Sequence, residues 1–189
     1  MRCNADMPAD IKSPWVSAVL RFWFTELMPR QWFIKDEELD ALIRERFLPA
    51  YEHVRQSLFA DQELSARETL AAVIVLDQFP RNMFRGTPQA FATDAQALAM
   101  AQSAVAQGQD RELSKKQRLF LYMPFQHSED RAVQARSIEL FTALGENLGY
   151  ARRHQEVIER FGRFPHRNAI LGRTSTPEER EFLEHNPGF

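Results

Sequence analysis

One short segment brings together side chains that could do chemistry: Asp77-Gln-Phe-Pro-Arg-Asn82, followed closely by Arg85. Asp77 comes directly after the most apolar stretch of the chain, 70–76. An acid near the end of a buried helix opposes the helix dipole and loses water, so it needs a partner, and an arginine is the natural one. The pair is either a structural ion pair that fixes the helix end or part of a polar site, and the segment alone leaves both open.

A second segment is rich in arginine. Residues 152–173 hold six arginines against two acids, in a chain whose net charge is -2. Guanidinium groups bind carboxylate and phosphate through paired hydrogen bonds, so this excess predicts an anion-binding surface. The residues that we single out in it are Arg163, His166, Arg167 and Asn168. The alternative is that several of these arginines pair with acids elsewhere in the chain and the rest are solvated.

The two segments share a faint pattern. Phe79-Pro-Arg-Asn82 and Phe164-Pro-His-Arg-Asn168 each place basic residues and an asparagine after a Phe-Pro pair. Phe-Pro is a common way to end a helix, so the repetition is compatible with chance.

The third segment is His127-Ser-Glu129-Asp130. As structure, Ser128 would cap a helix and the two acids would lie in its first turn, where the helix dipole favours them. As chemistry, a histidine and two carboxylates could bind a divalent metal or transfer protons. His-x-Glu-Asp is not a recognised ligand spacing, so we favour the capping role and assign no metal ligands.

Several familiar catalytic motifs are missing from the sequence. It has no phosphate loop, no Rossmann glycine pattern, no Gly-x-Ser-x-Gly, no His-Glu-x-x-His and no cysteine pair. We therefore predict no cofactor. Cys3 is the only cysteine, so no disulfide can form within the chain, and a reduced, cytoplasmic setting is expected.

The composition is that of an ordinary globular protein. A chain of 189 residues suits one domain, and its apolar share of 44% and charged share of 26% are typical. The net charge of -2 argues against a general attraction to nucleic acid. The most apolar N-terminal stretch, 15–24, is short and contains Arg21, so we expect no membrane-spanning segment.

Four tetrapeptides have the form of a capping box, in which a hydroxyl accepts from a free N–H and a Glu or Gln three residues later reaches back. They are Ser65-Ala-Arg-Glu68, Thr93-Asp-Ala-Gln96, Ser114-Lys-Lys-Gln117 and Thr176-Pro-Glu-Glu179. Apolar residues recur between them with helical period. The apolar run 70–76 could be a buried strand, but its capping box and the lack of a partner strand favour a central helix.

We therefore predict an all-α protein of about eight helices, joined as antiparallel hairpins by short connections. The expected helices lie near 14–28, 36–48, 50–59, 66–79, 94–107, 115–123, 129–148 and 151–161, with a short one at 177–185. Pro49 should kink or restart the helix around it. Residues 1–12 are expected to form a flexible tail, and residues 13–189 a single all-helical domain.

Several long stretches of this sequence are distinctive: Val19-Leu-Arg-Phe-Trp-Phe24, Trp32-Phe-Ile-Lys-Asp36, Leu76-Asp-Gln-Phe-Pro-Arg-Asn82, Phe84 to Asp94, Tyr122 to Asp130, Arg160 to Gly172 and Ser175 to Glu178. They resemble stretches of a family of uncharacterised bacterial proteins known as DUF924. The resemblance runs from about Val16 to Phe189. The family is similar in fold to tetratricopeptide-like proteins, so the resemblance implies a tetratricopeptide-like right-handed array of hairpins. It implies no activity.

Three hypotheses of function remain. We prefer a helical-hairpin binding module whose arginine-rich groove takes an anionic small molecule or an acidic peptide. Its ligand-binding residues would be Asp77, Arg81, Asn82, Arg85, Arg163, Arg167 and Asn168.

The second hypothesis is a hydrolytic enzyme, in which His127 or His166 is the general base and Glu129 or Asp130 binds a metal or orients the histidine. In the third, the polar segments only hold the helices together, and the protein acts through a surface partner. Each hypothesis is compatible with a homo-oligomer.

Overall fold

The computed structural model describes residues 14–57 and 64–186, and in these ranges the chain is all-α, as predicted. The expected tail at 1–12, with Cys3, lies outside the described residues. So does the end of the helix predicted at 50–59.

The first two helices follow the apolar periodicity with one exception. Helix α1 (Pro14–Arg21) passes directly into a π-helical turn, η2 (Phe22–Glu26), and the short turn η3 (Pro29–Trp32) leads to α2 (Glu37–Gln56). Helix α2 continues through Pro49, so the prediction of two helices at 36–48 and 50–59 is wrong. A proline inside a helix costs about 3 kcal/mol. The buried face formed by Phe47, Tyr51 and Val54 keeps the same register on both sides of Pro49, and its burial offsets that cost.

The central helix contains the apolar run. It consists of α3 (Ala66–Val73), a π-helical turn η5 (Ile74–Gln78) and α4 (Phe79–Met83). Ser65 and Glu68 form the predicted capping box. Residues 70–76 are all completely buried, as expected for a helix surrounded by others.

This helix runs past its predicted end at Phe79 because Thr93 replaces a missing hydrogen-bond donor. Pro80 has no N–H for the carbonyl oxygen of Leu76, four residues earlier. The hydroxyl of Thr93 donates to that oxygen at 2.6 Å. The Thr93 side chain makes no hydrogen bond to the start of α5, so the capping box predicted for it does not form.

The remaining elements are 3-10 turns and helices. They are η6 (Pro88–Phe91), α5 (Asp94–Ala106), η7 (Gln109–Glu112), α6 (Lys115–Gln126), α7 (Arg131–Leu144), α8 (Leu148–Phe161), η8 (Pro165–Arg167) and α9 (Pro177–His185). The capping boxes at Ser114 and Thr176 form as predicted. Ser128 does not cap α7, contrary to prediction: Asp130 does, since its carboxylate accepts from the N–H of Val133 at 2.9 Å. The helix predicted at 129–148 ends at Leu144 because Gly145 takes a left-handed conformation, with φ 71°.

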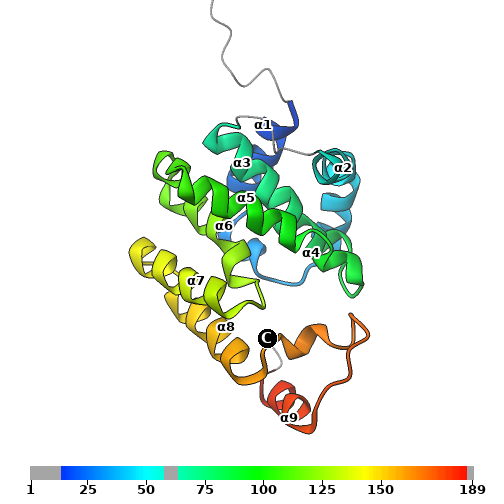
Figure 1. Ribbon diagram of the computed structural model, residues 1–189. Helices are drawn as coiled ribbons and strands as arrows, with labels where there is room; N and C mark the ends of the chain where they lie inside the picture. The colour runs from blue at the N-terminus through cyan, green and yellow to red at the C-terminus, as the bar shows by residue number, and fades with distance from the viewer. Residues whose placement is uncertain (1–13, 58–63, 187–189) are drawn as a thin grey trace, which may run out of the picture.

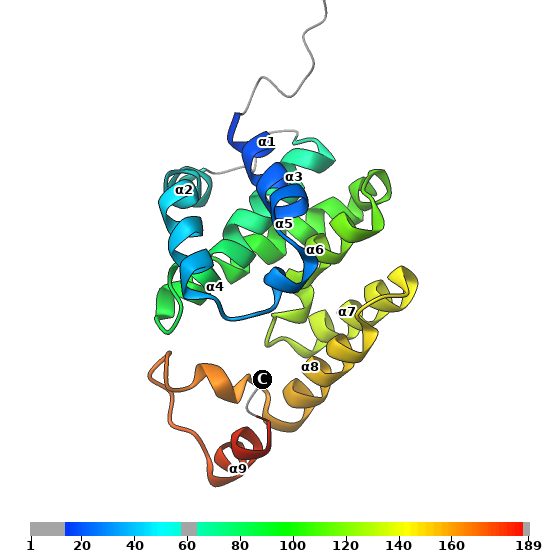
Figure 2. The same cartoon turned by 180° about the vertical axis from the view of Figure 1, so that it is seen from behind.

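Helices α1 to α6 surround the main apolar core, and α7 and α8 form a hairpin that extends from it (Figure 1). The chain after α8 folds back below α4, as the reverse view also shows (Figure 2). A second, small apolar cluster of Val157, Ile158 and Phe164 lies in this C-terminal part. No helix in the described ranges is long and apolar enough to cross a membrane. The tetratricopeptide-like handedness of the array stays a prediction.

Candidate functional site

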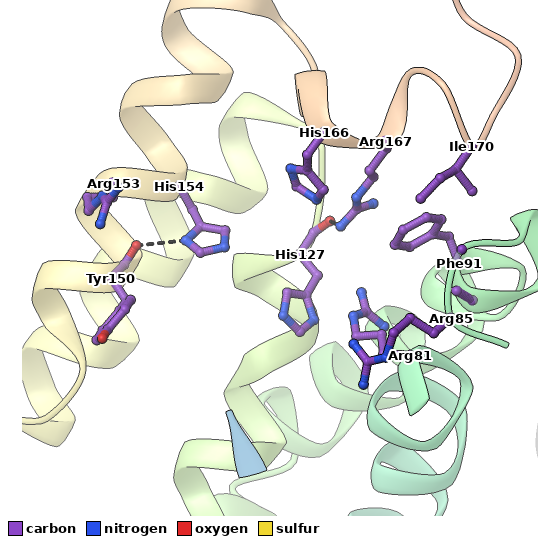
Figure 3. A pocket seen from close by; sticks show the side chains of 12 residues that line it. Arg81, Arg85, Phe91, His127, Tyr150, Arg153, His154, His166, Arg167 and Ile170 are labelled. Atoms are coloured by element: carbon purple, nitrogen blue, oxygen red, sulfur yellow. Dashed lines mark hydrogen bonds between the residues drawn. The ribbon is translucent and has the colours of Figure 1, made fainter. Parts of the chain in front are cut away.

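A pocket of about 340 Å³ lies where the end of the central helix meets the C-terminal part of the chain (Figure 3). Its walls come from α4 and the turns after it, the end of α6, the start of α8, and the segment around η8. The lining residues, which we call the basic pocket, are Arg81, Arg85, Gly86, Ala90, Phe91, His127, Tyr150, Arg153, His154, His166, Arg167 and Ile170.

Positive and titratable nitrogen groups dominate this lining. Among the described residues that line the pocket are four arginines and three histidines, and none of these residues carries a carboxylate. The side chains of Arg81, His127 and Arg167 point toward one another (Figure 3). A concave surface with charges of one sign concentrates the electrostatic field and attracts ions of the opposite sign.

Asp77 lies behind the pocket and is fully buried. Its carboxylate is 2.8 Å from Nδ1 of His127 and 3.3 Å from Nη1 of Arg81, and it also accepts from the side-chain amide of Gln78. Burial raises the pKa of Asp77, but the charge of Arg81 and the hydrogen bond with His127 outweigh burial, so that the pKa is lowered. The carboxylate is thus ionised and can only accept, which places the Nδ1 proton on His127.

Asp94 joins two arginines that are far apart in the sequence. Its two oxygens accept from Arg81 at 2.9 and 3.0 Å, and Oδ2 also accepts from Arg167 at 3.2 Å. Neighbouring guanidinium groups repel each other, so a shared carboxylate is what allows both to line one pocket.

The faint repeat of Phe-Pro strings therefore has a structural counterpart. Arg81 and Arg167, one from each string, bind the same carboxylate of Asp94. The asparagine that follows each arginine binds a different acid: Asn82 donates to Asp40 at 2.7 Å, and Asn168 donates to Glu179 at 3.1 Å.

Arg167 is deeply enclosed, with 7% of its surface exposed. Its guanidinium lies 4.6 Å from the ring centre of Phe91 and 4.7 Å from that of Phe164, and it donates to the carbonyl oxygen of His127 at 2.9 Å. Burial, followed by the charge of Arg81, lowers the pKa of Arg167 to about 10, which still leaves it charged at neutral pH. Its buried Nε has no hydrogen-bond partner among the described residues.

The surroundings keep the three histidines neutral. Burial and then the charge of Arg81 lower the pKa of His127. Burial, with His127 nearby, lowers the pKa of His154 to about 4. Burial and Arg167 lower the pKa of His166 to about 3. At neutral pH the positive charge of the pocket therefore comes from its arginines.

Arg85 lies at the edge of the pocket and is attached to α2. It donates to the two carboxylate oxygens of Asp40 at 2.6 and 2.8 Å. Asn82 also contacts Asp40 but does not line the pocket. Asn82 thus supports Arg85, and of these two sequence candidates only the arginine faces the cavity.

Two other sequence candidates, Arg163 and Asn168, lie away from the pocket. Arg163 donates to the carboxylate of Glu179 at 2.7 and 2.9 Å, and Asn168 donates to it at 3.1 Å. The hydrogen bond from Arg163, together with others, lowers the pKa of Glu179 to about 2. We call these three residues the C-terminal cluster. It holds α9 against the segment that follows α8, so Arg163 and Asn168 stabilise the fold of this part of the chain.

Glu129 and Asp130, the candidates for metal binding or for orienting a histidine, also lie outside the lining. Glu129 accepts from Arg173 at 2.8 and 3.0 Å, and Asp130 caps α7. Within 14–57 and 64–186, no three His, Cys, Asp or Glu side chains are grouped so that they could hold a metal ion. The acid that orients His127 is Asp77, which corrects the expectation for Glu129 and Asp130.

Sequence reasoning misses several residues of the site, notably Asp94, Phe91 and His154. The capping-box pattern at Thr93 gives Asp94 an ordinary role in a first helical turn and hides its contacts with two arginines. Arg153 does fall in the arginine-rich segment, but the spacing of six arginines does not tell which of them face a cavity.

Comparisons with known proteins identify relatives but no activity. Residues 19–187 match the model of a family described as "Bacterial protein of unknown function (DUF924)". The chain is also similar to the solved structure of a protein of unknown function, ATU0120, from Agrobacterium tumefaciens. The two are 41% identical with a TM-score of 0.86, over 91% of this chain and 98% of that one. Among curated proteins, no match is found.

Proposed function

Because the chain belongs to the DUF924 family, whose function is unknown, we propose a function from the pocket itself: it binds a small organic anion that carries a phosphate or carboxylate group. One observation carries this proposal. The four arginines of the pocket line the cavity, whereas the carboxylates that hold three of them, Asp40, Asp77 and Asp94, do not.

The acids behind the pocket fix the arginines in place before any ligand arrives. Asp94 holds Arg81 through both of its oxygens and Arg167 through one, and Phe91 and Phe164 enclose the Arg167 guanidinium. Side chains that are already ordered lose little entropy on binding, which increases affinity.

The size and the apolar part of the lining favour a small molecule over an acidic peptide. A cavity of about 340 Å³ falls at the lower end of the range for small-molecule sites. Phe91, Tyr150 and Ile170 line it beside the arginines, which suits a ligand with an apolar or aromatic body. An acidic peptide would instead need a long open groove with charges along its length.

The positions of the charges favour an anion. Arg81, Arg85 and Arg167 line the cavity, while the carboxylates that they bind lie behind them, so positive groups face a bound molecule. As part of the same proposal, we place the protein in the cytoplasm, where such metabolites occur and where its single cysteine would stay reduced.

Isothermal titration calorimetry with phenylphosphonate tests the proposal, using Arg153→Ala and the matched control Arg152→Ala. Both arginines are exposed and adjacent in α8, but only Arg153 lines the pocket. Arg153→Ala should weaken binding about tenfold, the effect of losing one contact to a charged group. Arg152→Ala should change affinity less than about twofold, because solvent and salt screen an exposed charge that lies outside the pocket. No binding by the wild type, or an equal loss in both variants, would overturn the proposal.

A further inference from the structure

We infer that the basic pocket is also catalytic: His127, oriented by Asp77, is the general base in the hydrolysis of a phosphate monoester held by the arginines. This inference rests on the proposed anion binding and adds a reaction to it. The observation behind it is the contact between a pocket histidine and a buried carboxylate.

The imidazole of His127 is held in one orientation with one nitrogen available. Nδ1 lies 2.8 Å from Oδ1 and 3.1 Å from Oδ2 of Asp77, and the backbone carbonyl of His127 accepts from Arg167 at 2.9 Å. Because Nδ1 carries the proton, Nε2 of the neutral ring is an acceptor. Nε2 has no hydrogen-bond partner among the described residues, and the side chain lines the pocket. It can therefore accept a proton from a molecule bound there.

Asp77 makes His127 a better base than its neighbour. When Nε2 gains a proton, the buried carboxylate stabilises the resulting imidazolium and itself stays unprotonated. The Nδ1 of His154, by contrast, donates to the carbonyl oxygen of Tyr150 at 2.8 Å, which fixes its tautomer with a neutral acceptor (Figure 3). Asp77 does not line the pocket, so it is a positioning residue and His127 is the catalytic one.

The lining also indicates the substrate class. Water is the nucleophile in this reaction, activated by His127 as the base. Arg81, Arg85 and Arg167 would bind the phosphoryl oxygens and neutralise their charge, which is the main requirement of phosphoryl transfer. Phe91 and Tyr150 would contact the apolar body of the ester.

The step is balanced without any further reactant. Water attacks phosphorus and forms a new P–O bond as His127 Nε2 takes one of its protons. The bond from phosphorus to the ester oxygen breaks, and that oxygen leaves with the electron pair. The leaving oxygen takes a proton from solvent, and the imidazolium returns its proton to solvent, so the products are an alcohol or phenol and hydrogen phosphate.

The test compares turnover and binding in the wild type and in His127→Asn. Asparagine keeps an amide donor near the position of Nδ1, so that Asp77 retains a partner, but it offers no base. Turnover is measured with p-nitrophenyl phosphate, and binding is measured with phenylphosphonate, which has no ester bond to break. We expect His127→Asn to lower kcat about 100-fold or more, while its affinity for phenylphosphonate changes less than about threefold. The control variant Arg152→Ala should keep the wild-type rate.

The role of Asp77 has its own readout in the pH profile. For the wild type, kcat/KM should fall as acid protonates His127, below the ordinary histidine pKa, because burial and Arg81 lower the pKa of His127. Asp77→Asn should lower kcat more than it changes KM, since an amide can hold the ring in the wrong tautomer. A profile unchanged by Asp77→Asn would remove the positioning role.

The outcomes separate this inference from the proposed function. Wild-type protein that binds phenylphosphonate but does not hydrolyse p-nitrophenyl phosphate would overturn the inference alone. So would His127→Asn at the wild-type rate. Wild-type protein that binds neither compound would overturn both the inference and the proposed function.

Discussion

The basic pocket and the C-terminal cluster both contain arginines paired with enclosed carboxylates, and they differ in what the arginines face. In the C-terminal cluster, Nε and Nη2 of Arg163 both donate to the carboxylate of Glu179, a residue that is 1% exposed. In the pocket, Arg81 and Arg167 share Asp94 on one side and line a cavity of about 340 Å³ on the other. An enclosed ion pair is therefore a sign of structure, and it becomes a sign of binding only where part of the cation faces a cavity.

Loss of the buried Asp77 carboxylate should destabilise the protein more than any other change proposed here. Asp77→Asn should lower the free energy of unfolding by about 3 kcal/mol at neutral pH, because Arg81 and His127 lose their charged partner inside the protein. Urea unfolding followed by circular dichroism measures this change. Asp130→Asn is the matched control, since asparagine caps a helix about as well as aspartate, and it should cost less than about 0.5 kcal/mol. Equal stability of the two variants would show that Asp77 is not paired as described.

A somewhat smaller effect is expected in the C-terminal cluster, and it should not reach the pocket. Glu179→Gln removes the charge that Arg163 and Asn168 bind, and should lower the free energy of unfolding by about 2 kcal/mol. Its affinity for phenylphosphonate, measured by calorimetry, should stay within about twofold of the wild type. A variant that folds normally and yet binds tenfold more weakly would erase the distinction between the two regions.

The aromatic side chain of Phe91 should contribute less to ligand binding than the arginines do. Phe91→Leu keeps an apolar side chain but removes the ring beside Arg167, and should weaken the free energy of binding by about 1 kcal/mol or less. The variant should bind phenylphosphonate a few times more weakly, while its affinity for inorganic phosphate should change less. Phe161→Leu is the control, because Arg160 lies 4.7 Å from that ring outside the pocket. The same change of ligand preference in both variants would argue that Phe91 does not contact the ligand.

The smallest effect is a coupling between anion binding and pH, which only the pocket should show. The pKa values of His154 and His166, lowered to about 4 and about 3, lie below the ordinary value of 6.5. Below pH 6.5 the unfolded chain therefore binds more protons than the folded one, and stability falls as the pH decreases toward 4. The groups that act on these rings are His127, Arg81, Arg153 and Arg167, and His154 also acts on His166, while Asp77 and Asp94 lie behind Arg81.

A bound anion raises the pKa of those histidines and so opposes that fall in stability. Sulfate serves as the probe because it keeps its charge throughout this range. Thermal unfolding should show that sulfate stabilises the protein more at about pH 5 than at neutral pH. A stabilisation that is equal at both, or larger at neutral pH, would contradict the coupling.

The sequence predicts the helices well because caps and apolar periodicity are local. The boxes at Ser65, Ser114 and Thr176 mark three helix starts correctly. The exceptions arise where a distant contact decides. The hydroxyl of Thr93 donates to the carbonyl oxygen of Leu76 instead of forming the predicted capping box. Helix α2 continues through Pro49 because its buried face packs against the core.

The site was predictable only as segments. The sequence indicates that Asp77, Arg81, His127 and Arg167 are unusual, and the structure brings them together. The sequence cannot show that Arg167 shares an acid with Arg81 while Arg163 pairs with Glu179. Arg163 and Arg167 are only four residues apart in one arginine-rich segment, so their positions in the sequence do not distinguish them. Which arginine faces a cavity depends on how the chain folds back after α8.

The most direct test of the central claim is to locate a bound anion in crystals of the protein soaked in tungstate, a heavy analogue of phosphate. Binding in the pocket predicts an anomalous peak among the guanidinium groups of Arg81, Arg153 and Arg167. Peaks confined to arginines outside the pocket, such as Arg152 or Arg163, would contradict it.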